Sequence, residues 1–263
     1  GVTLLLFAYG FLMDGFGTKV RARSLTALDQ QAGEAATWAR LSYYAGVAPE
    51  EGLSFDNQTV VYPIRSASSA YETSTRNDRR LLIWDADRQQ LTRGWLASRT
   101  PAQYLTVTSR ATSRRLDIAP RGDALAVTNL LGVDIVALAI EDHEGSFYWV
   151  GELADGATGR AEKTAYVDMS GQLRELFTNN ETRFPIGGEI DSRLTSARLE
   201  QNLMEGQLGA TVSPVSRSLG PGRFVAVTDR GMDLDLGVEG AAEKASFHVV
   251  QGTFAPPEGS DEL

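Results

Sequence analysis

The sequence has no cysteine, only two histidines and only three lysines among its 263 residues. The lack of cysteine excludes disulfides, thiolate nucleophiles and cysteine-ligated zinc or iron–sulfur centres. It does not fix the compartment, because chains without cysteine occur in reducing and oxidising settings alike. The net charge of -9 argues against nucleic acid as the main partner, since that binding relies on positive charge.

Signatures of the common enzyme classes are also missing. The sequence contains no Gly-x-Ser-x-Gly, no Walker phosphate loop and no Gly-x-Gly-x-x-Gly after a strand. His143 lies in a turn of Asp-His-Glu-Gly. His248 stands between Phe247 and Val249, where we expect a hydrogen-bonded residue on a half-buried strand face rather than a general base. No catalytic residue can be named, so the sequence favours a non-enzymatic protein while leaving catalysis open.

Long apolar runs are scarce, and the one exception is residues 1–13, which include no charged side chain. A membrane-spanning helix needs about 20 apolar residues, so this run is too short to cross a bilayer alone. We expect residues 1–16 to be the end of a truncated membrane anchor. A core element of the fold and a signal peptide are the alternatives. Lys19, Arg21 and Arg23 follow the run, which favours a cytoplasmic flank, but their alternation also suits one face of a strand.

Short alternating segments separated by polar turns dominate the rest of the chain. The clearest are two predicted hairpins, 19–27 with 35–44 and 134–141 with 146–151. Further strands are expected at 60–64, 79–84, 104–108, 115–118, 124–129, 161–167, 223–228 and 245–250. Such spacing without long helical patterns predicts a mainly β fold, an antiparallel β-sandwich of the Ig-like or jelly-roll-like kind.

The pattern changes near Met169. Residues 170–177 suit one or two helical turns, and 191–208 are the best helix candidate, with an apolar stripe at helical spacing. We therefore predict a β-sandwich domain at 17–168, a smaller α+β part with one main helix at 169–254, and a flexible tail at 255–263. Alternatively, the helix packs on one sheet whose last strands come from the C-terminal part.

Two groups of side chains are candidates for binding. Arg110, Arg114 and Arg115 can form a cationic face that suits an acidic protein partner or phospholipid head groups. Trp84 and Trp95 can supply aromatic contacts. The alternative for the arginines is a solvated surface with ordinary salt bridges.

An acidic segment near the C-terminus is a weak candidate for a metal site. Asp233, Asp235 and Glu239 have a spacing similar to an oxygen-rich calcium loop, but the full pattern of such a loop is missing. An acidic surface loop without metal is the alternative, and we expect no cofactor apart from this calcium candidate.

Two segments resemble an uncharacterised group of membrane-anchored bacterial proteins with β-rich extracytoplasmic regions. One is 21–30 together with 41–46, and the other is 236–240 together with 245–250. The resemblance covers about an eighth of the chain and carries no catalytic motif. It implies an anchored domain outside the cytoplasm, in the periplasm, and no functional residue.

These observations predict a non-enzymatic extracytoplasmic binding or scaffolding domain of a membrane-anchored protein, held at the membrane by its N-terminal segment and meeting a protein partner. The alternatives are a hydrolase of cell-envelope carbohydrate and a soluble lectin-like module. A hydrolase would need two carboxyl groups about 5 to 9.5 Å apart, which sequence spacing cannot select. The sequence leaves open the partner, the oligomeric state, the side of the membrane and whether the chain is a fragment.

Overall fold

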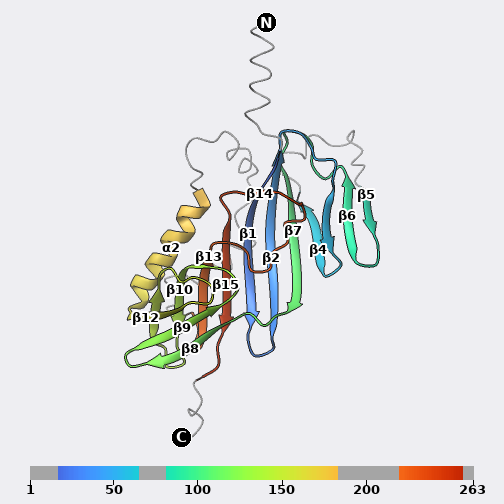
Figure 1. The fold of residues 1–263 in the computed structure, drawn as a ribbon. Helices are drawn as coiled ribbons and strands as arrows, with labels where there is room; N and C mark the ends of the chain where they lie inside the picture. The colour runs from blue at the N-terminus through green and yellow to red at the C-terminus, as the bar shows by residue number, and fades with distance from the viewer. Residues whose placement is uncertain (1–16, 65–80, 183–218, 257–263) are drawn as a thin grey trace, which may run out of the picture.

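The structure, a computed structural model, describes residues 17–64, 81–182 and 219–256, with the side chains of 178–182 excepted. Figure 1 shows a mainly β molecule with one helix in this part of the chain. The strands form a twelve-stranded mixed sheet and a three-stranded sheet. The prediction of a mainly β fold is confirmed, whereas the predicted antiparallel β-sandwich is not, because most strands belong to one large sheet.

The large sheet has the order β4-β7-β2-β1-β15-β13-β10-β11-β12-β9-β8, and β14 also pairs with β1. Its strands are β1 (Thr18–Asp29), β2 (Glu34–Ala45), β4 (Thr59–Ile64), β7 (Ala102–Ala111), β8 (Arg115–Arg121), β9 (Ala124–Leu130), β10 (Ile135–Glu141), β11 (Phe147–Val150), β12 (Thr158–Thr164), β13 (Arg223–Thr228), β14 (Ala242–Glu243) and β15 (Phe247–Thr253). The small sheet, in the order β3-β6-β5, comprises β3 (Leu53–Asp56), β5 (Leu81–Trp84) and β6 (Arg88–Arg93).

The hairpin of β1 and β2 lies inside the large sheet, between β7 and β15, and confirms the first predicted hairpin. Its turn is stabilised by Asp29, whose carboxylate accepts the backbone N–H groups of Gln31 at 3.0 Å and Ala32 at 2.9 Å. Gly33 completes the turn at a φ of 68°, which glycine adopts without a steric penalty. The second predicted hairpin is confirmed by β10 and β11.

The C-terminal strands are part of the same sheet as the N-terminal ones. β15 pairs in parallel with β1, and β13 joins β15 to β10. The predicted domain boundary at 168/169 falls inside α2 (Tyr166–Thr182), and strands from both sides of it share one sheet. The large sheet is thus completed by C-terminal strands.

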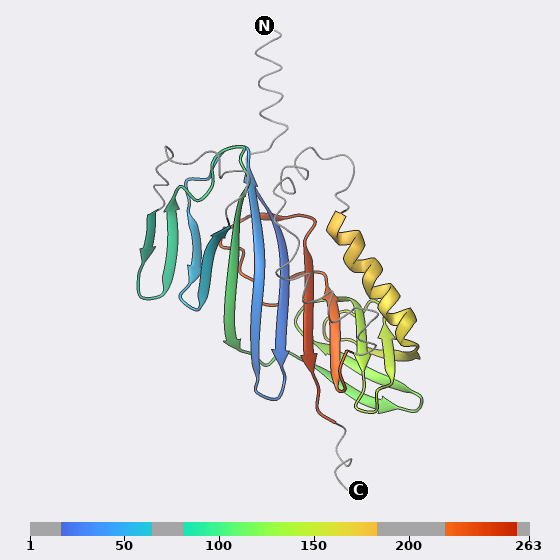
Figure 2. The same ribbon diagram turned by 180° about the vertical axis from the view of Figure 1, so that it is seen from behind.

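The helix α2 covers one face of the large sheet, which we call the helix face (Figure 2). Met169 and Leu173, one helical turn apart, are fully buried among residues such as Leu25 and Val249 from β1 and β15. The ring of Phe177 packs edge-on against that of Phe247, with centroids 5.4 Å apart. The helical turns predicted at 170–177 are confirmed as part of this longer helix. The helix predicted at 191–208 lies outside the described residues.

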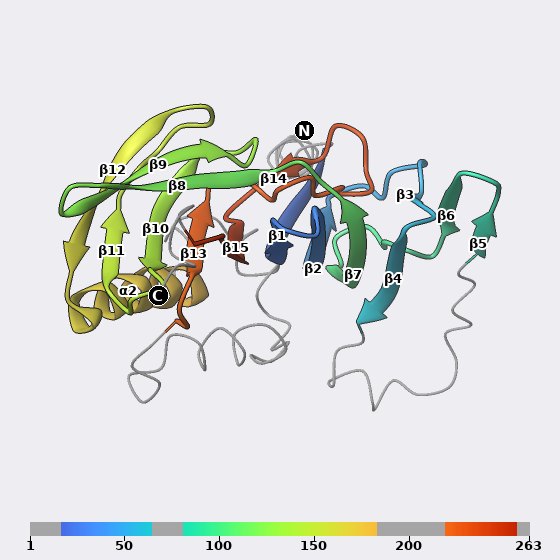
Figure 3. The same cartoon turned by 90° about the horizontal axis from the view of Figure 1, so that it is seen from below.

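The opposite face of the sheet, which we call the loop face, encloses a core by curling over itself. Figure 3 shows β8 and β9 lying across the sheet from β10 and β13. Leu116 of β8, Val127 of β9 and Ile140 of β10 meet inside this curl, all of them buried. At the edge of the curl, the side chain of Gln30 accepts a hydrogen bond from the backbone N–H of Leu116 at 2.5 Å. One curled sheet thus buries its own inner face.

A second core on the loop face lies between the large sheet, the small sheet and the segment 234–241. At its centre Tyr43 is fully buried, with ring centroids 5.5 Å from Trp95 and 5.9 Å from Tyr104. The Tyr43 hydroxyl donates a 2.7 Å hydrogen bond to the backbone carbonyl of Leu236. Burial raises the pKa of Tyr43 well above 10.0, and the nearby Asp235 raises it further.

Replacing Tyr43 with phenylalanine removes this hydrogen bond and leaves the carbonyl of Leu236 without its donor. We expect Tyr43→Phe to lower the free energy of unfolding by about 1–2 kcal/mol at pH 7, measured by urea denaturation. Because the folded pKa is raised, the wild-type protein loses stability as the pH rises above about 10, where the unfolded tyrosine ionises. The variant lacks this contribution. The exposed Tyr62→Phe is the control, and equal losses in both variants would contradict the prediction.

The described residues contain no helix that is long and apolar enough to cross a membrane. The predicted anchor at 1–16 and most of the predicted tail at 255–263 fall outside the part of the chain that the structure describes.

Candidate binding surfaces

The edge strand β5 exposes four consecutive large apolar side chains. Leu81, Leu82 and Ile83 are 44–49% exposed, and Trp84 is 72% exposed. Among the described strands, β5 pairs with β6 alone, so its other edge is unpaired in this part of the chain. Exposed apolar edge strands promote association with other chains, and stable proteins usually avoid or cover them. Such a strand is therefore a candidate binding surface.

Trp84 is held in place although its ring is exposed. Its indole N–H donates to the side-chain carbonyl of Gln89 at 3.3 Å. The amide of Gln89, which is buried, donates in turn to the backbone carbonyls of Asp56 and Thr59. The side chain of Asn57 also bonds the turn that follows β5, at 2.8 Å to the carbonyl of Ala86. These contacts connect β5 to the β3–β4 turn and fix the direction of the indole.

The other predicted partner-binding residues lie in different surroundings. Trp95 is only 4% exposed and packs in the core beside Tyr43, so its ring is not presented to a partner. Arg110 forms an ion pair with Asp56, Arg114 with Asp233 at 3.3 Å, and Arg115 with Asp117 at 2.7 Å. The structure therefore places the three arginines in ordinary surface ion pairs rather than in one cationic face.

The predicted calcium candidates do not converge. Asp233 pairs with Arg114, and the carboxylate of Asp235 accepts the backbone N–H of Gly237 at 2.8 Å. No bond of the Glu239 side chain to the other two is present. In the ranges that the structure describes, no three His, Asp or Glu side chains lie close enough to hold a metal ion.

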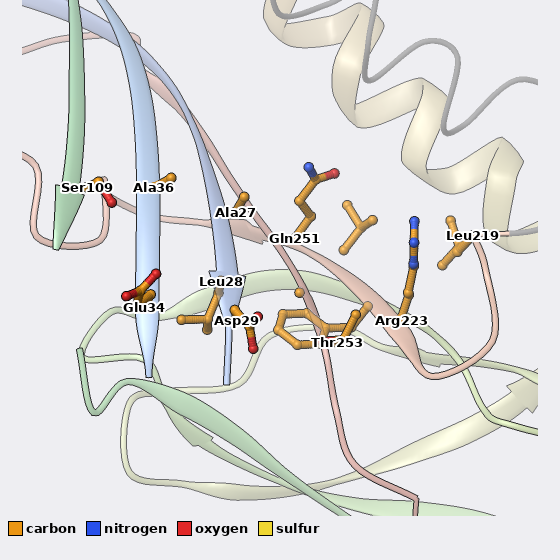
Figure 4. Close-up of a pocket in the computed structure, with 13 residues that line it drawn as sticks. Ala27, Leu28, Asp29, Glu34, Ala36, Ser109, Leu219, Arg223, Gln251 and Thr253 are labelled. Atoms are coloured by element: carbon orange, nitrogen blue, oxygen red, sulfur yellow. The ribbon is translucent and has the colours of Figure 1, made fainter. Parts of the chain in front are cut away.

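A pocket of about 440 Å³ lies on the helix face, at the end of the β1–β2 hairpin (Figure 4). Two rows of cross-strand neighbours form its floor. One row runs Glu34, Asp29, Thr253 and Arg223 across β2, β1, β15 and β13. The next row runs Ser109, Ala36, Ala27, Gln251 and Val225, from β7 to β13. Leu219 forms an apolar part of the pocket wall.

The pocket adjoins an apolar row on the part of the helix face beyond α2. The row consists of Val60 on β4, Val107 on β7 and Trp38 on β2, each paired with the next across the sheet. On its other side, Trp38 pairs with Leu25 of β1. Val60 and Trp38 are exposed, whereas Leu25 is buried beneath α2. Trp38 lies one row from the pocket, because Ala36 is its neighbour on the same face of β2.

One cluster of side chains has the residue types of a hydrolytic triad, a serine, a histidine and a carboxylate. The hydroxyl of Ser24 on β1 lies 2.7 Å from Nδ1 of His248 on β15, and Nε2 of His248 lies 2.9 Å from a carboxylate oxygen of Glu243. Partial burial raises the pKa of Glu243, but hydrogen bonds from His248 and Ser246 lower it by more, so the net pKa is lowered. The prediction that His248 is a hydrogen-bonded strand residue is confirmed.

The surroundings of this cluster argue against catalysis. His248 is 1% exposed and Ser24 is 3% exposed, and a Cβ on Gly231 would lie 3.1 Å from Nδ1 of His248. The segment after β13 thus covers the imidazole, and a nucleophile needs space for a substrate beside it. Ser24, His248 and Glu243 instead connect three strands of the sheet, β1, β15 and β14.

Comparisons with known proteins add no function. No family model and no curated protein matches the sequence. Among solved structures, Legionella pneumophila aminopeptidase A in complex with aspartic acid is similar at a TM-score of 0.23 and 12% identity, over 43% of this chain and 13% of that one. The yeast delta-COP-I mu-homology domain complexed with a Dsl1 WxWxV peptide is similar at 0.29 and 6% identity, over 90% of this chain and 95% of that one. Both TM-scores are too low to show a common fold.

Sequence reasoning did not find the pocket or the Ser24–Glu243 partners of His248. The pocket residues come from β1, β2, β7, β13 and β15, which span most of the sequence, so no local sequence pattern predicts the pocket. The sequence around His248 indicated a hydrogen-bonded strand residue but not its partners. Ser24, the partner of Nδ1, lies 224 residues away in the chain.

Proposed function

We propose that this chain is a non-enzymatic binding domain that engages a partner protein through β5, with Trp84 at the centre of the contact. The observation that carries the proposal is the exposed run of four apolar side chains on an edge strand. Tryptophan dominates the energetics of many protein interfaces because it buries a large, rigid surface. The bonds that hold Trp84 through Gln89 reduce the entropy lost on binding.

The geometry of β5 suits a partner that adds an extended segment to the sheet. Strand addition uses backbone hydrogen bonds for affinity and alternate side chains for specificity. In β5, Leu81 and Ile83 lie on one face, and Leu82 and Trp84 on the other. An incoming apolar strand would cover side chains on both faces and extend the small sheet from three strands to four.

The location is part of the same proposal. Residues 1–16 would hold the domain at a membrane, on the extracytoplasmic side, with no cofactor required. The apolar run at 1–13 and the resemblance to membrane-anchored bacterial proteins support this placement, and sequencing the reading frame upstream of residue 1 tests it. A polar, charged upstream segment would argue against the anchor.

Photo-crosslinking in cells tests the contact. A photoreactive phenylalanine analogue at position 84 should give one discrete adduct with a partner, whereas the same analogue at Val167 should give none. Val167 is a matched control because it is 76% exposed but lies on α2, away from β5. Adding Leu82→Lys should abolish the adduct, since a charge on an edge strand opposes pairing. Equal labelling from positions 84 and 167 would overturn the proposal.

A further inference from the structure

The helix-face pocket combines a volume and a charge arrangement that point to a specific class of ligand. Its volume of about 440 Å³ lies in the range of small-molecule sites. Among the described residues, the side chains of Glu34, Arg223 and Gln251 make no hydrogen bond or ion pair. The arginines at the earlier candidate sites, in contrast, each have a carboxylate partner.

The two free charges have opposite sign and lie at opposite sides of the pocket. Figure 4 shows Glu34 and Asp29 on one side and Arg223 on the other, with Thr253 between them. Glu34 and Arg223 occupy the same cross-strand row, with β1 and β15 between their strands. Strands lie about 4.8 Å apart, so the two Cα atoms are about 14 Å apart. Their charges are too far apart to neutralise each other directly.

The middle of the pocket offers neutral polar groups above an apolar floor. The amide of Gln251 can donate and accept, which is what a peptide group requires. Ala27, Ala36 and Val225 keep the floor low, so a ligand backbone can lie close to the sheet. Asp29 is less available to a ligand than Glu34, because one of its carboxylate oxygens already accepts hydrogen bonds from two N–H groups of the turn.

We propose that this pocket binds a short, unblocked peptide, with its terminal carboxylate at Arg223 and its terminal ammonium at Glu34. Arginine binds a carboxylate through two parallel hydrogen bonds, and Glu34 supplies the opposite charge for the ammonium. An extended chain spans about 3.3–3.6 Å per residue, so three to four residues fit the distance between these side chains. The site is separate from β5, and the partner contact at Trp84 does not depend on it.

Isothermal titration calorimetry with tetra-alanine tests the proposal, because its charges are at its two ends only. We expect tetra-alanine to bind at least about tenfold more tightly than its N-acetylated, C-amidated form. Arg223→Gln should weaken tetra-alanine about tenfold but leave the binding of C-amidated peptide unchanged. Glu34→Gln should likewise weaken the binding of tetra-alanine about tenfold but leave the binding of the N-acetylated peptide, which has no ammonium, unchanged.

The exchange of both charges provides a second test. Glu34→Arg combined with Arg223→Glu should restore binding that each single substitution abolishes, since the peptide can then lie in the reverse direction. Circular dichroism confirms that each variant is folded. Binding that depends on one end of the peptide only, or no heat at about 10 mM tetra-alanine, would overturn the inference.

Discussion

Gly237→Ala should destabilise the protein by about 3–5 kcal/mol, because two independent penalties fall on one residue. Gly237 has a φ of 68°, in the left-handed region that residues with a Cβ adopt at a cost. A Cβ there would also meet the ring of Phe55, within 2.7 Å of its Cε1 and Cε2 atoms. Phe55 is buried in the second core and cannot move aside without disturbing it.

The same position connects the acidic segment to the small sheet. The carbonyl of Gly237 accepts the backbone N–H of Ser54 at 2.8 Å, and its own N–H donates to Asp235. Displacing this residue therefore also breaks the attachment of the segment to β3. Urea denaturation of wild type and variant gives the loss directly, from the shift of the midpoint.

Gly240 offers a matched control that separates the two penalties. It has the same φ of 68°, but nothing lies within 4 Å of an added Cβ. We expect Gly240→Ala to lose only about 1 kcal/mol, the backbone part of the effect. Phe55→Leu in the Gly237→Ala background should recover part of the steric loss. Equal losses at both glycines would show that contact with Phe55 does not matter.

Local alternation predicted the strands well because it is a property of neighbouring residues. The hairpins of β1 with β2 and β10 with β11 follow from apolar residues at every second position and polar turns between them. Alternation cannot distinguish two facing sheets from one sheet that curls, because both bury one face of each strand. For this reason the mainly β fold is confirmed and the β-sandwich is not.

Elements with weak apolar patterns were missed or shortened. The strand β6 has the sequence Arg-Gln-Gln-Leu-Thr-Arg and is recognisable only through its pairing with β3 and β5. The helix α2 was predicted at 170–177 alone, because its first residues were included in the strand predicted at 161–167, whereas β12 ends at Thr164 and α2 begins at Tyr166. The parallel pairing of β1 with β15 joins segments more than 200 residues apart, which no local pattern contains.

Among the candidate binding residues, the sequence predicted residue types but not burial or partners. Trp84 was selected for its residue type, and the structure shows its ring exposed on an edge strand. Trp95 was selected on the same ground but is buried, because residue type alone does not give burial. Arg110 and Arg114 were grouped by their proximity in sequence, yet their partners, Asp56 and Asp233, lie far away in the chain.

Removing the imidazole of His248 should destabilise the protein by about 3–4 kcal/mol, the second large effect expected. His248→Ala leaves a cavity at a side chain that is 1% exposed and leaves the buried hydroxyl of Ser24 without its partner. It also removes one of the hydrogen bonds to the carboxylate of Glu243, a residue of β14 that pairs with Val20 of β1. His143→Ala is the control. His143 is the other histidine and its side chain is exposed in a turn, where it bonds the backbone carbonyl of Phe254 at 3.1 Å and touches the Phe254 ring. Its loss removes one hydrogen bond without leaving a buried cavity and should cost only about 1 kcal/mol.

The acid side of the stability curve distinguishes this bonded cluster from simple packing. The pKa of Glu243 is lowered from 4.5 in the folded protein, so its contribution to stability is present above that pH. This contribution is lost as the pH falls through the lower folded pKa. The reason is that the Glu243 carboxyl takes up a proton at a higher pH in the unfolded chain than in the folded protein. Glu243→Gln should therefore destabilise the protein at about pH 6, and its difference from wild type should shrink towards about pH 3. A difference that stays constant across this range would show that the Glu243 carboxylate has no role as an anion bonded to His248.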